Sequence, residues 1–394
     1  MSKIQSRMTV AAFALLLLLI TMLRLDLFIG TEMGVWLYRI LASLSILGLV
    51  WAIGSLFSTK VMRWLLVALV LGECLMAVGF RLTAMRVSMP TPIVSAFSYL
   101  YFFHFCEAMI YHDNRSRYDE QVFYTLKPGQ FSFKNIEFSN HYEVNSLGFR
   151  DDEASLQTPG MVFLGDSYTM GWGVDQDASY PELLAKRFGK KALNTGIASY
   201  GTARELLALR KVQLDSCRLL VLQFCPNDVA ENRSFMADGL NLKVSPRRVY
   251  ENEMRHNRLN AHYFPFKFTY GCCAFVVKKI REGITHTDKP NGYPNSLSQT
   301  EVADFFAIVQ EMRKLYAGPI VILHLGMGVT KPEVYNEFQQ WLLAHPMPGV
   351  SVFNTAEVLS EPDYYLLDKH LTVAGNEKLA AGLASFMEGE GIGW

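Results

Sequence analysis

Hydrophobic residues are distributed differently in the two parts of this chain. Long apolar runs at 8–30, 34–57 and 64–80 dominate the first part, and the second comes close, without interruption, to the ~20 apolar residues that a helix needs to cross a bilayer. From about residue 120, short apolar runs alternate with helical patterns, which is typical of βα units around a parallel sheet. The pattern therefore predicts three transmembrane helices followed by an α/β domain.

The three apolar runs differ in how well each suits a membrane span. The middle run is the cleanest, because no charged residue falls between Arg39 and Lys60. The first run meets Arg24 and Asp26 near its end, and the third carries Glu73 at mid-depth. We expect Glu73 to be neutral or paired within the helical bundle, with Arg39 as a candidate partner, rather than to mark a proton or substrate path. A cleaved signal peptide is the competing interpretation of the first run, but no small-residue cleavage site follows it.

Positive charges flanking the runs predict the orientation of the chain. Lys3 and Arg7 precede the first run, and Lys60 and Arg63 lie between the second and third. Cytoplasmic loops carry an excess of such residues, so both regions are expected on the cytoplasmic side. Three spans then place the remainder of the chain on the opposite side of the membrane.

Residues 90–119 connect the membrane region to the α/β domain. The Phe- and Tyr-rich stretch 90–111 contains two prolines and two ionisable side chains, which favours a helix lying at the membrane interface. A fourth span over the same stretch is the alternative, and it would return the following domain to the cytoplasm.

The second part of the chain predicts a three-layer α/β/α domain of the flavodoxin-like kind over residues 120–394, with about five parallel strands. The candidate strands are 161–165, 191–195, 218–224, 319–325 and 350–353. The helical segments between and after them are 179–188, 202–214, 300–316, 331–344 and 372–388. Residues 233–298 fit no repeating unit and are expected to form an insertion over the functional site.

Charge and cysteine content limit the classes of function. Lys plus Arg and Asp plus Glu both number 37, so the overall balance indicates no nucleic-acid partner. No CxxC motif or Cys/His spacing suggests a zinc site, and we expect neither a metal nor another cofactor.

Side chains with catalytic potential follow three of the predicted strands. Ser167 follows the first strand in a Gly-Asp-Ser turn, residues 194–202 follow the second, and Asn227 follows the third. Because carboxyl ends of parallel strands share one edge of a sheet, where ligands usually bind, we expect these turns to lie together. Asp368 and His370 precede the last helical segment. A serine, a base and a carboxylate are the parts that acyl transfer requires.

These four blocks together resemble the SGNH (GDSL) hydrolase family over roughly residues 120–390, and residues 145–150 are similar to a lead-in found in many bacterial members. The resemblance implies that Ser167 is the nucleophile, His370 the base that removes its proton, and Asp368 the carboxylate that orients the imidazole. Asp166, beside the nucleophile, is expected to be structural.

The resemblance also implies an oxyanion hole that stabilises the tetrahedral intermediate. Its donors would be the backbone N–H groups of Ser167 and of a residue in the second block (residues 194–202, called block two), together with the side chain of Asn227. Without gaps, the family's block-two glycine falls at Ser199, and the nearest glycine is Gly201. Because the donor is a backbone N–H group, either residue fits the role.

Asp368 and His370 are separated by one residue, which is one fewer than the commonest family spacing. This arrangement is similar to that of SGNH-like polysaccharide O-acetylation proteins. Together, the family resemblance, the three predicted spans and their flanking charges lead us to expect a multi-pass bacterial inner-membrane protein with a periplasmic catalytic domain. Its substrate would be an acyl ester, with O-acetyl groups of a cell-envelope glycan favoured. A transferase would also need an acyl donor delivered across the bilayer, which points to a multi-span membrane transporter as partner.

Two other functions are consistent with the sequence. A catalytically silent subunit could bind polysaccharide and dock a membrane complex, and a lipid esterase would need a broad apolar pocket beside Ser167. Single residues also have simpler interpretations. Ser167 could merely cap a helix, Trp172 could pack against a loop instead of stacking on a sugar, and His324 is expected to be a core histidine.

Overall fold

The computed structural model describes residues 3–23, 28, 30–260, 262–285, 296–326 and 328–392. These residues group into two compact units, each described by itself below. Unit 1 takes its residues from Met1–Ala108, Glu251–Lys289 and Leu366–Asp368. Unit 2 takes its residues from Met109–Tyr250, Pro290–Tyr365 and Lys369–Trp394.

Unit 2 contains a parallel sheet of five strands in the order β6-β5-β7-β8-β9. The strands are β5 (Met161–Leu164), β6 (Ala192–Asn194), β7 (Leu219–Phe224), β8 (Ile320–His324) and β9 (Val350–Phe353). Apart from Asn194, Gln223, His324 and Ser351, their residues are apolar, which suits strands of a parallel sheet covered by helices. The five expected strands are thus confirmed, and β5 lies between the two strands that follow it in the chain.

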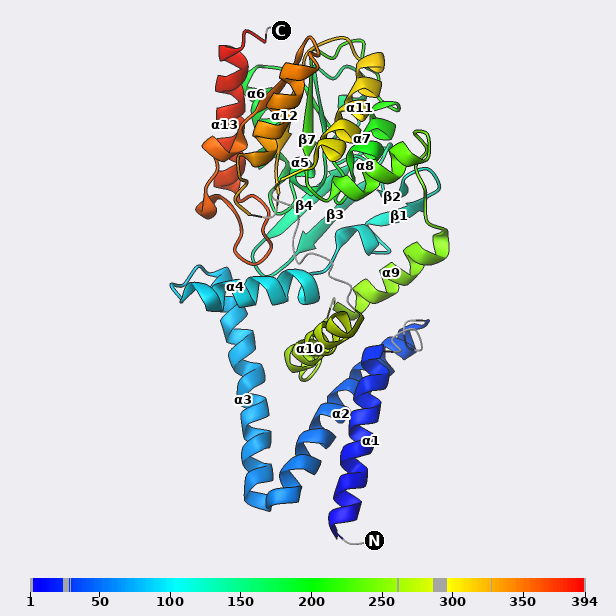
Figure 1. Cartoon of the computed structure of the whole chain (residues 1–394), viewed down its shortest axis with the longest axis vertical. Helices are drawn as coiled ribbons and strands as arrows, with labels where there is room; N and C mark the ends of the chain where they lie inside the picture. The colour runs from blue at the N-terminus through cyan, green and yellow to red at the C-terminus, as the bar shows by residue number, and fades with distance from the viewer. Residues whose placement is uncertain are drawn as a thin grey trace. The chain divides into compact units, whose positions relative to one another are not determined.

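Helices cover both faces of this sheet (Figure 1). The helices packed on one face are α6 (Tyr180–Arg187) and α13 (Val373–Gly389). The helices on the other side are α7 (Thr202–Leu209), α8 (Asp228–Ala237), α11 (Gln299–Leu315) and α12 (Glu333–Ala344). Neighbouring strand residues point to opposite faces. Val221 joins the core under α6 and α13, whereas the Phe224 ring lies 5.1 Å from Phe305 of α11 and 5.2 Å from Phe338 of α12. The expected three-layer architecture is therefore confirmed.

Two antiparallel hairpins precede the sheet in unit 2, and the sequence analysis did not predict them. The first pairs β1 (Ser116–Asp119) with β2 (Phe123–Leu126), and the second pairs β3 (Gly129–Lys134) with β4 (Ser139–Val144). Their signal in the sequence is the alternation of apolar and polar residues, which places Phe133, Tyr142 and Val144 in the interior. Single 3₁₀ turns occupy Met109–Tyr111, Ala154–Leu156, Gln176–Ala178, Thr355–Glu357 and Glu361–Asp363.

Unit 1 contains three helices that are long and apolar enough to cross a membrane. They are α1 (Lys3–Leu23), α2 (Glu32–Phe57) and α3 (Thr59–Ala84). Ser58 ends α2 and begins α3, and its side chain accepts a hydrogen bond from the N–H of Val61. A Cβ atom on Gly54 would lie 2.6 Å from Cα of Met62, so this tight turn requires glycine there. Arg24 and Asp26, which the sequence places near the end of the first apolar run, lie outside the described residues.

The segment after α3 forms α4 (Thr91–Leu100), which continues as a π-helix over Tyr101–Phe105. Pro92 stands in the first turn, where its missing N–H costs no hydrogen bond. At ~1.5 Å per residue the two pieces span about 22 Å, less than the ~30 Å hydrocarbon core. A fourth span over this stretch is therefore not supported, and an interfacial position stays a prediction.

The expected insertion at 233–298 is not one piece. The described residues of 251–285 group with the long apolar helices of unit 1, and 233–250 and 296–298 group with unit 2. The segment contains α9 (Arg247–Asn260) and α10 (Lys267–Thr285), while 286–295 lie outside the described residues. Helix α10 packs against α2 and α3. Its apolar part, Lys267–Val277, is shorter than a membrane span, so the hydropathy of the sequence does not single it out.

Glu73, within α3, caps the beginning of α10. Its carboxylate accepts hydrogen bonds from the backbone N–H groups of Phe268 at 3.0 Å and Thr269 at 2.9 Å. The hydroxyl groups of Thr269 and Tyr263 donate to it at 2.8 and 3.1 Å. A carboxylate at a helix N-terminus satisfies otherwise unpaired N–H groups and interacts favourably with the helix dipole. Pairing inside the bundle was expected, but these four donors take the place of the candidate partner Arg39.

Replacing Glu73 tests this cap. Glu73→Ala would leave two N–H groups without their acceptor, and we expect it to destabilise unit 1 by about 2–4 kcal/mol. Glu73→Gln keeps an acceptor oxygen and should cost less. Thermal unfolding of the detergent-solubilised protein measures both. Cys74→Ala changes the exposed neighbour on α3 and serves as control. A melting temperature for Glu73→Ala equal to that of the wild type would contradict the capping role.

Candidate active site

Ser167 is the first residue of the short helix α5 (Ser167–Met170), directly beyond the carboxyl end of β5. Asp166 caps this helix by accepting a hydrogen bond from the N–H of Tyr168 at 3.0 Å. A Cβ atom on Gly165 would lie 2.1 Å from Oγ1 of Thr169, so the turn has no room for any side chain there. The Gly-Asp-Ser sequence therefore determines the position at which the Ser167 hydroxyl leaves the sheet, and Asp166 has the structural role expected for it.

The hydroxyl of Ser167 meets the imidazole of His370. Ser167 Oγ and His370 Nε2 are 2.7 Å apart, although the two residues are separated by 203 positions. Only 9% of Ser167 is exposed. A serine hydroxyl at this distance from an imidazole nitrogen can transfer its proton when it attacks a carbonyl carbon. The structure thus brings together two of the residues that the sequence singled out.

Two aromatic rings contact the imidazole of His370. The Trp172 ring stacks on it with centroids 5.4 Å apart and an angle of 26°, and the Tyr168 ring lies 4.8 Å away. The two rings therefore hold the imidazole in place by packing on it. Trp172 is 6% exposed and also contacts Phe133, with centroids 4.8 Å apart. Its packing interpretation is therefore confirmed, and a sugar-stacking platform at Trp172 is not.

The residue between Asp368 and His370 has a left-handed backbone conformation. Lys369 has φ of 70°, which is uncommon for a residue with a side chain. The carbonyl of His370 accepts from the N–H of Tyr365 at 2.8 Å, and the carbonyl of Lys369 accepts from the hydroxyl of Tyr168 at 3.2 Å. These hydrogen bonds hold a strained backbone conformation next to the imidazole, as is common at functional sites.

Asp368, the third predicted triad residue, is fully buried. Its carboxylate accepts a hydrogen bond from the thiol of Cys106, with Sγ and Oδ2 3.8 Å apart. By its contacts Asp368 belongs to unit 1, whereas Ser167 and His370 belong to unit 2. Its role in orienting the imidazole therefore stays a prediction.

The candidate oxyanion residues lie after β6 and β7. Ser199 has φ of 61°, in the left-handed region that glycine favours, whereas Gly201 has an extended φ of −101°. Ser199 thus adopts a backbone conformation that glycine adopts more readily than serine. Asn227 immediately precedes α8, and its Oδ1 atom is buried without a hydrogen-bond partner among the described residues.

Two polar residues hold the Ser167 turn: Gln223, which the sequence analysis did not select, and Asn194, the first residue of the predicted turn at 194–202. Gln223 Oε1 accepts hydrogen bonds from the N–H of Asp166 at 3.0 Å and from Oγ1 of Thr169 at 3.2 Å. Asn194 donates to the carbonyl of Thr169 at 2.8 Å and accepts from the N–H of Gly196 at 3.0 Å. The sequence did contain a hint of the role of Gln223, because it is the single polar residue in the otherwise apolar strand β7.

Arg150 explains the lead-in at residues 145–150. Its guanidinium is fully buried and lies 3.8 Å from the centroid of the Tyr142 ring. It donates to the backbone carbonyls of Met170, Gly171 and Val174 at 3.0, 2.6 and 2.8 Å. Burial lowers the pKa of this group. These bonds fix the turn that carries Trp172, so the lead-in supports the loop beside Ser167 and His370.

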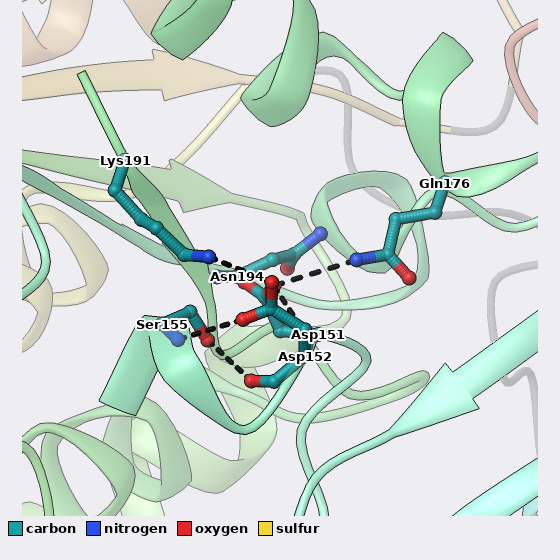
Figure 2. Close-up of polar contacts among 6 residues, drawn as sticks. All are labelled: Asp151, Asp152, Ser155, Gln176, Lys191 and Asn194. Carbon is teal, nitrogen blue, oxygen red and sulfur yellow. Dashed lines mark hydrogen bonds and ion pairs between the residues drawn. The ribbon is translucent and has the colours of Figure 1, made fainter. Parts of the chain in front are cut away.

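Asp151, the next residue, binds the start of the block-two turn (Figure 2). Its carboxylate accepts hydrogen bonds from the N–H groups of Asn194 at 2.9 Å and Asp152 at 2.8 Å, and from Gln176 Nε2 at 3.4 Å. Burial raises the pKa of Asp151 to about 7. The neighbouring Asp152 is exposed and pairs with Lys191 at 2.6 Å.

His324 ends β8 and is buried beside Phe224, with ring centroids 6.0 Å apart. Burial lowers the pKa of its imidazole to about 4. The ring is therefore neutral at physiological pH, as fits the expected core histidine rather than a second base.

Comparison with known proteins identifies the class to which the chain belongs. The model of the GDSL-like lipase/acylhydrolase family matches residues 163–378, which is more than half of the chain. The chain therefore belongs to this family. The catalytic domain is accordingly that of an SGNH-type esterase.

Similar solved structures include a member of the lipolytic G-D-S-L family from Veillonella parvula, with 11% identity, coverage of 58% of this chain and 97% of that chain, and a TM-score of 0.35. A family two carbohydrate esterase from Clostridium thermocellum, in complex with cellohexaose, shows 12% identity, coverage of 60% and 65%, and a TM-score of 0.36. A family 2 carbohydrate esterase from Corynascus thermopiles shows 13% identity, coverage of 63% and 70%, and a TM-score of 0.34. No curated protein sequence matches this chain.

The raised pKa of Asp151 predicts a pH-dependent stability. Its folded pKa of about 7 exceeds the ordinary value of 3.8, so its contribution is complete below pH 3.8 and is lost as pH rises through 7. Between pH 5.5 and 8 the wild type should lose about 2 kcal/mol of stability that Asp151→Asn does not lose.

Melting temperatures of both proteins at the two pH values measure this difference. Asp152→Asn, which changes the exposed neighbour, should follow the wild type. Parallel pH trends for the wild type and Asp151→Asn would refute the assigned titration.

Proposed function

We propose that this protein is a membrane-anchored serine esterase or acyltransferase that works through an acyl-enzyme on Ser167. The contact of 2.7 Å between Ser167 Oγ and His370 Nε2 carries this proposal. Asp368 would orient the imidazole. The N–H of Ser167, the N–H of Ser199 or Gly201, and the side chain of Asn227 would bind the oxyanion.

The reaction would proceed in two halves. The hydroxyl of Ser167 attacks the acyl carbonyl carbon while His370 takes its proton, and the carbonyl oxygen becomes an oxyanion. When this intermediate collapses, the bond to the alcohol breaks and His370 returns the proton to the leaving oxygen. Water or a second hydroxyl group then attacks the acyl-enzyme with His370 again as base, which releases a carboxylic acid or a new ester.

The substrate class we propose is a short acyl ester, with O-acetyl groups on a cell-envelope glycan favoured. Limited access to Ser167 supports a short acyl group, because the residue is 9% exposed. Tyr168 and Trp172, which pack around His370, are also buried. The short Asp-x-His spacing supports the same class through its resemblance to polysaccharide O-acetylation proteins. A long-chain lipid ester would need a wider apolar groove at the nucleophile.

The three long apolar helices support attachment to a membrane. We place the protein in a bacterial inner membrane with its catalytic domain in the periplasm, on the basis of Lys3, Arg7, Lys60 and Arg63. A transferase of this kind would receive acyl groups from a multi-span membrane partner, whereas a hydrolase would need only water. The two activities share the same acyl-enzyme.

The first test measures p-nitrophenyl acetate hydrolysis by the full chain in detergent. Ser167→Ala and His370→Ala should each lower kcat by about a thousandfold or more, because each removes a part that acts in the same step. His324→Ala serves as control for the loss of an imidazole outside the site. Equal rates in the wild type and the Ser167 variant would exclude the acyl-enzyme and favour a silent binding subunit.

Acyl length separates the proposed substrate from a lipid. We expect kcat/KM for p-nitrophenyl acetate to exceed that for p-nitrophenyl decanoate by about a hundredfold, since each extra methylene must fit beside a buried Ser167. Both esters release the same leaving group, so the ratio reports acyl recognition alone. A preference for decanoate would overturn the short-acyl assignment.

A further inference from the structure

Unit 1 holds the segment that carries the predicted triad carboxylate. Two side chains, one within α4 and one just after the π-helix that continues it, contact residues 366–368. Ser98 Oγ donates a hydrogen bond to the carbonyl of Leu366, and Cys106 Sγ donates to Oδ2 of Asp368 at 3.8 Å. All four residues belong to unit 1. The first contact holds the backbone before Asp368, and the second reaches one oxygen of its carboxylate; the Cys106 thiol also lies 3.6 Å from the carbonyl oxygen of Glu107.

The position of Cys106 follows from the π-helix that precedes it. Cys106 ends this π-helix, and its N–H donates to the carbonyl of Tyr101 at 2.9 Å. At Cys106 the backbone becomes extended, with φ of −72° and ψ of 133°. A π-helix is rare and is often found at functional sites, because its extra residue re-aims the side chains that follow. Here it precedes the thiol that contacts Asp368.

The helix that carries these residues packs against the third membrane helix. A Cβ atom on Gly79 of α3 would lie 2.2 Å from the Phe97 ring of α4, so the absent side chain makes room for this ring. Phe80 of α3 contacts the rings of Phe97 and Phe105, with centroids 4.9 and 5.5 Å apart. Packing within unit 1 therefore runs continuously from α3 through α4 to residues 366–368.

From these contacts we infer that Cys106 is a positioning residue for Asp368, and that α3 and α4 support it. The inference rests on the proposed function, because it assigns Asp368 to the triad. A thiol is a weak hydrogen-bond donor, but a donor to one carboxylate oxygen would leave the other oxygen for the imidazole in the proposed triad. Cys106 touches no reacting atom in this scheme and acts only through the carboxylate.

The test measures p-nitrophenyl acetate turnover by full-length variants in detergent. Cys106→Ala should lower kcat about tenfold with KM unchanged, because the binding of the ester does not involve the thiol. Cys106→Ser keeps a donor and should restore most of the rate. Cys74→Ala removes an exposed thiol from the same unit and should equal the wild type. A full rate in Cys106→Ala, or an equal loss in both Cys106 variants, would overturn the inference.

A double-mutant cycle separates this inference from the proposed function. Asp368→Asn alone should lower kcat about a thousandfold or more. If Cys106 acts through Asp368, adding Cys106→Ala to that variant should cause no further loss. A further tenfold loss would place the action of Cys106 elsewhere and reject the inference while the triad stands. An unchanged rate in Asp368→Asn would reject the triad assignment, and the positioning role with it.

The support from α3 has its own matched pair of variants. Gly79→Leu would displace the Phe97 ring and should lower kcat. At Gly72 an added Cβ atom would meet no neighbouring atom within 4 Å, so Gly72→Leu introduces the same side chain without a clash. We expect the Gly72 variant to equal the wild type. Equal rates in the two variants would show that α3 does not support Asp368.

Discussion

The hydrogen bond between Ser167 and His370 depends on how a parallel sheet arranges its ends. The two residues are 203 positions apart, yet Oγ and Nε2 lie 2.7 Å from each other. Ser167 follows β5, whose strand neighbours are β6 and β7, and His370 precedes α13. Because α13 packs on the same face of the sheet as α6, its start is fixed relative to the end of β5. The apolar core thus sets a distance between two polar atoms that do not attract each other strongly by themselves.

Around this contact the protein buries polar side chains whose partners are chiefly backbone groups. Asp166 caps α5, Gln223 accepts from the N–H of Asp166, and Arg150 binds the carbonyls of the following turn. Burying such groups costs free energy unless each finds its partners, so they are poor devices for stability alone. They do, however, restrict the turn to one conformation. An enzyme that must hold a nucleophile within a few tenths of an ångström of its base gains from this restriction.

The parts of this structure that could be read from the sequence are those with a strong local pattern. The five parallel strands are mostly apolar runs, and Ser167 and His370 have side chains whose chemistry is specific. The hairpins at 116–144 are short and only half-buried, so their alternation is weak beside the long apolar runs. The sequence could not decide between Ser199 and Gly201 as the oxyanion donor, because every residue type except proline has a backbone N–H group. The two residues differ in their φ angles, which the sequence does not show. The contact between Cys106 and Asp368 joins positions 262 residues apart and has no local pattern at all.

Helix α3 carries more structure than an anchor requires. A helix that only crosses a bilayer needs about 20 apolar residues and no polar partner. Yet α3 places the carboxylate of Glu73 at the start of α10 and a glycine beneath the Phe97 ring of α4. Phe80 of α3 also contacts the Phe268 ring of α10, with centroids 5.1 Å apart. A buried carboxylate inside an apolar helix is costly unless it is fully hydrogen-bonded, and this one accepts four hydrogen bonds from residues 263–269. Segments from before and after Ser167 in the chain therefore both pack on α3, which makes this long apolar helix a scaffold for unit 1.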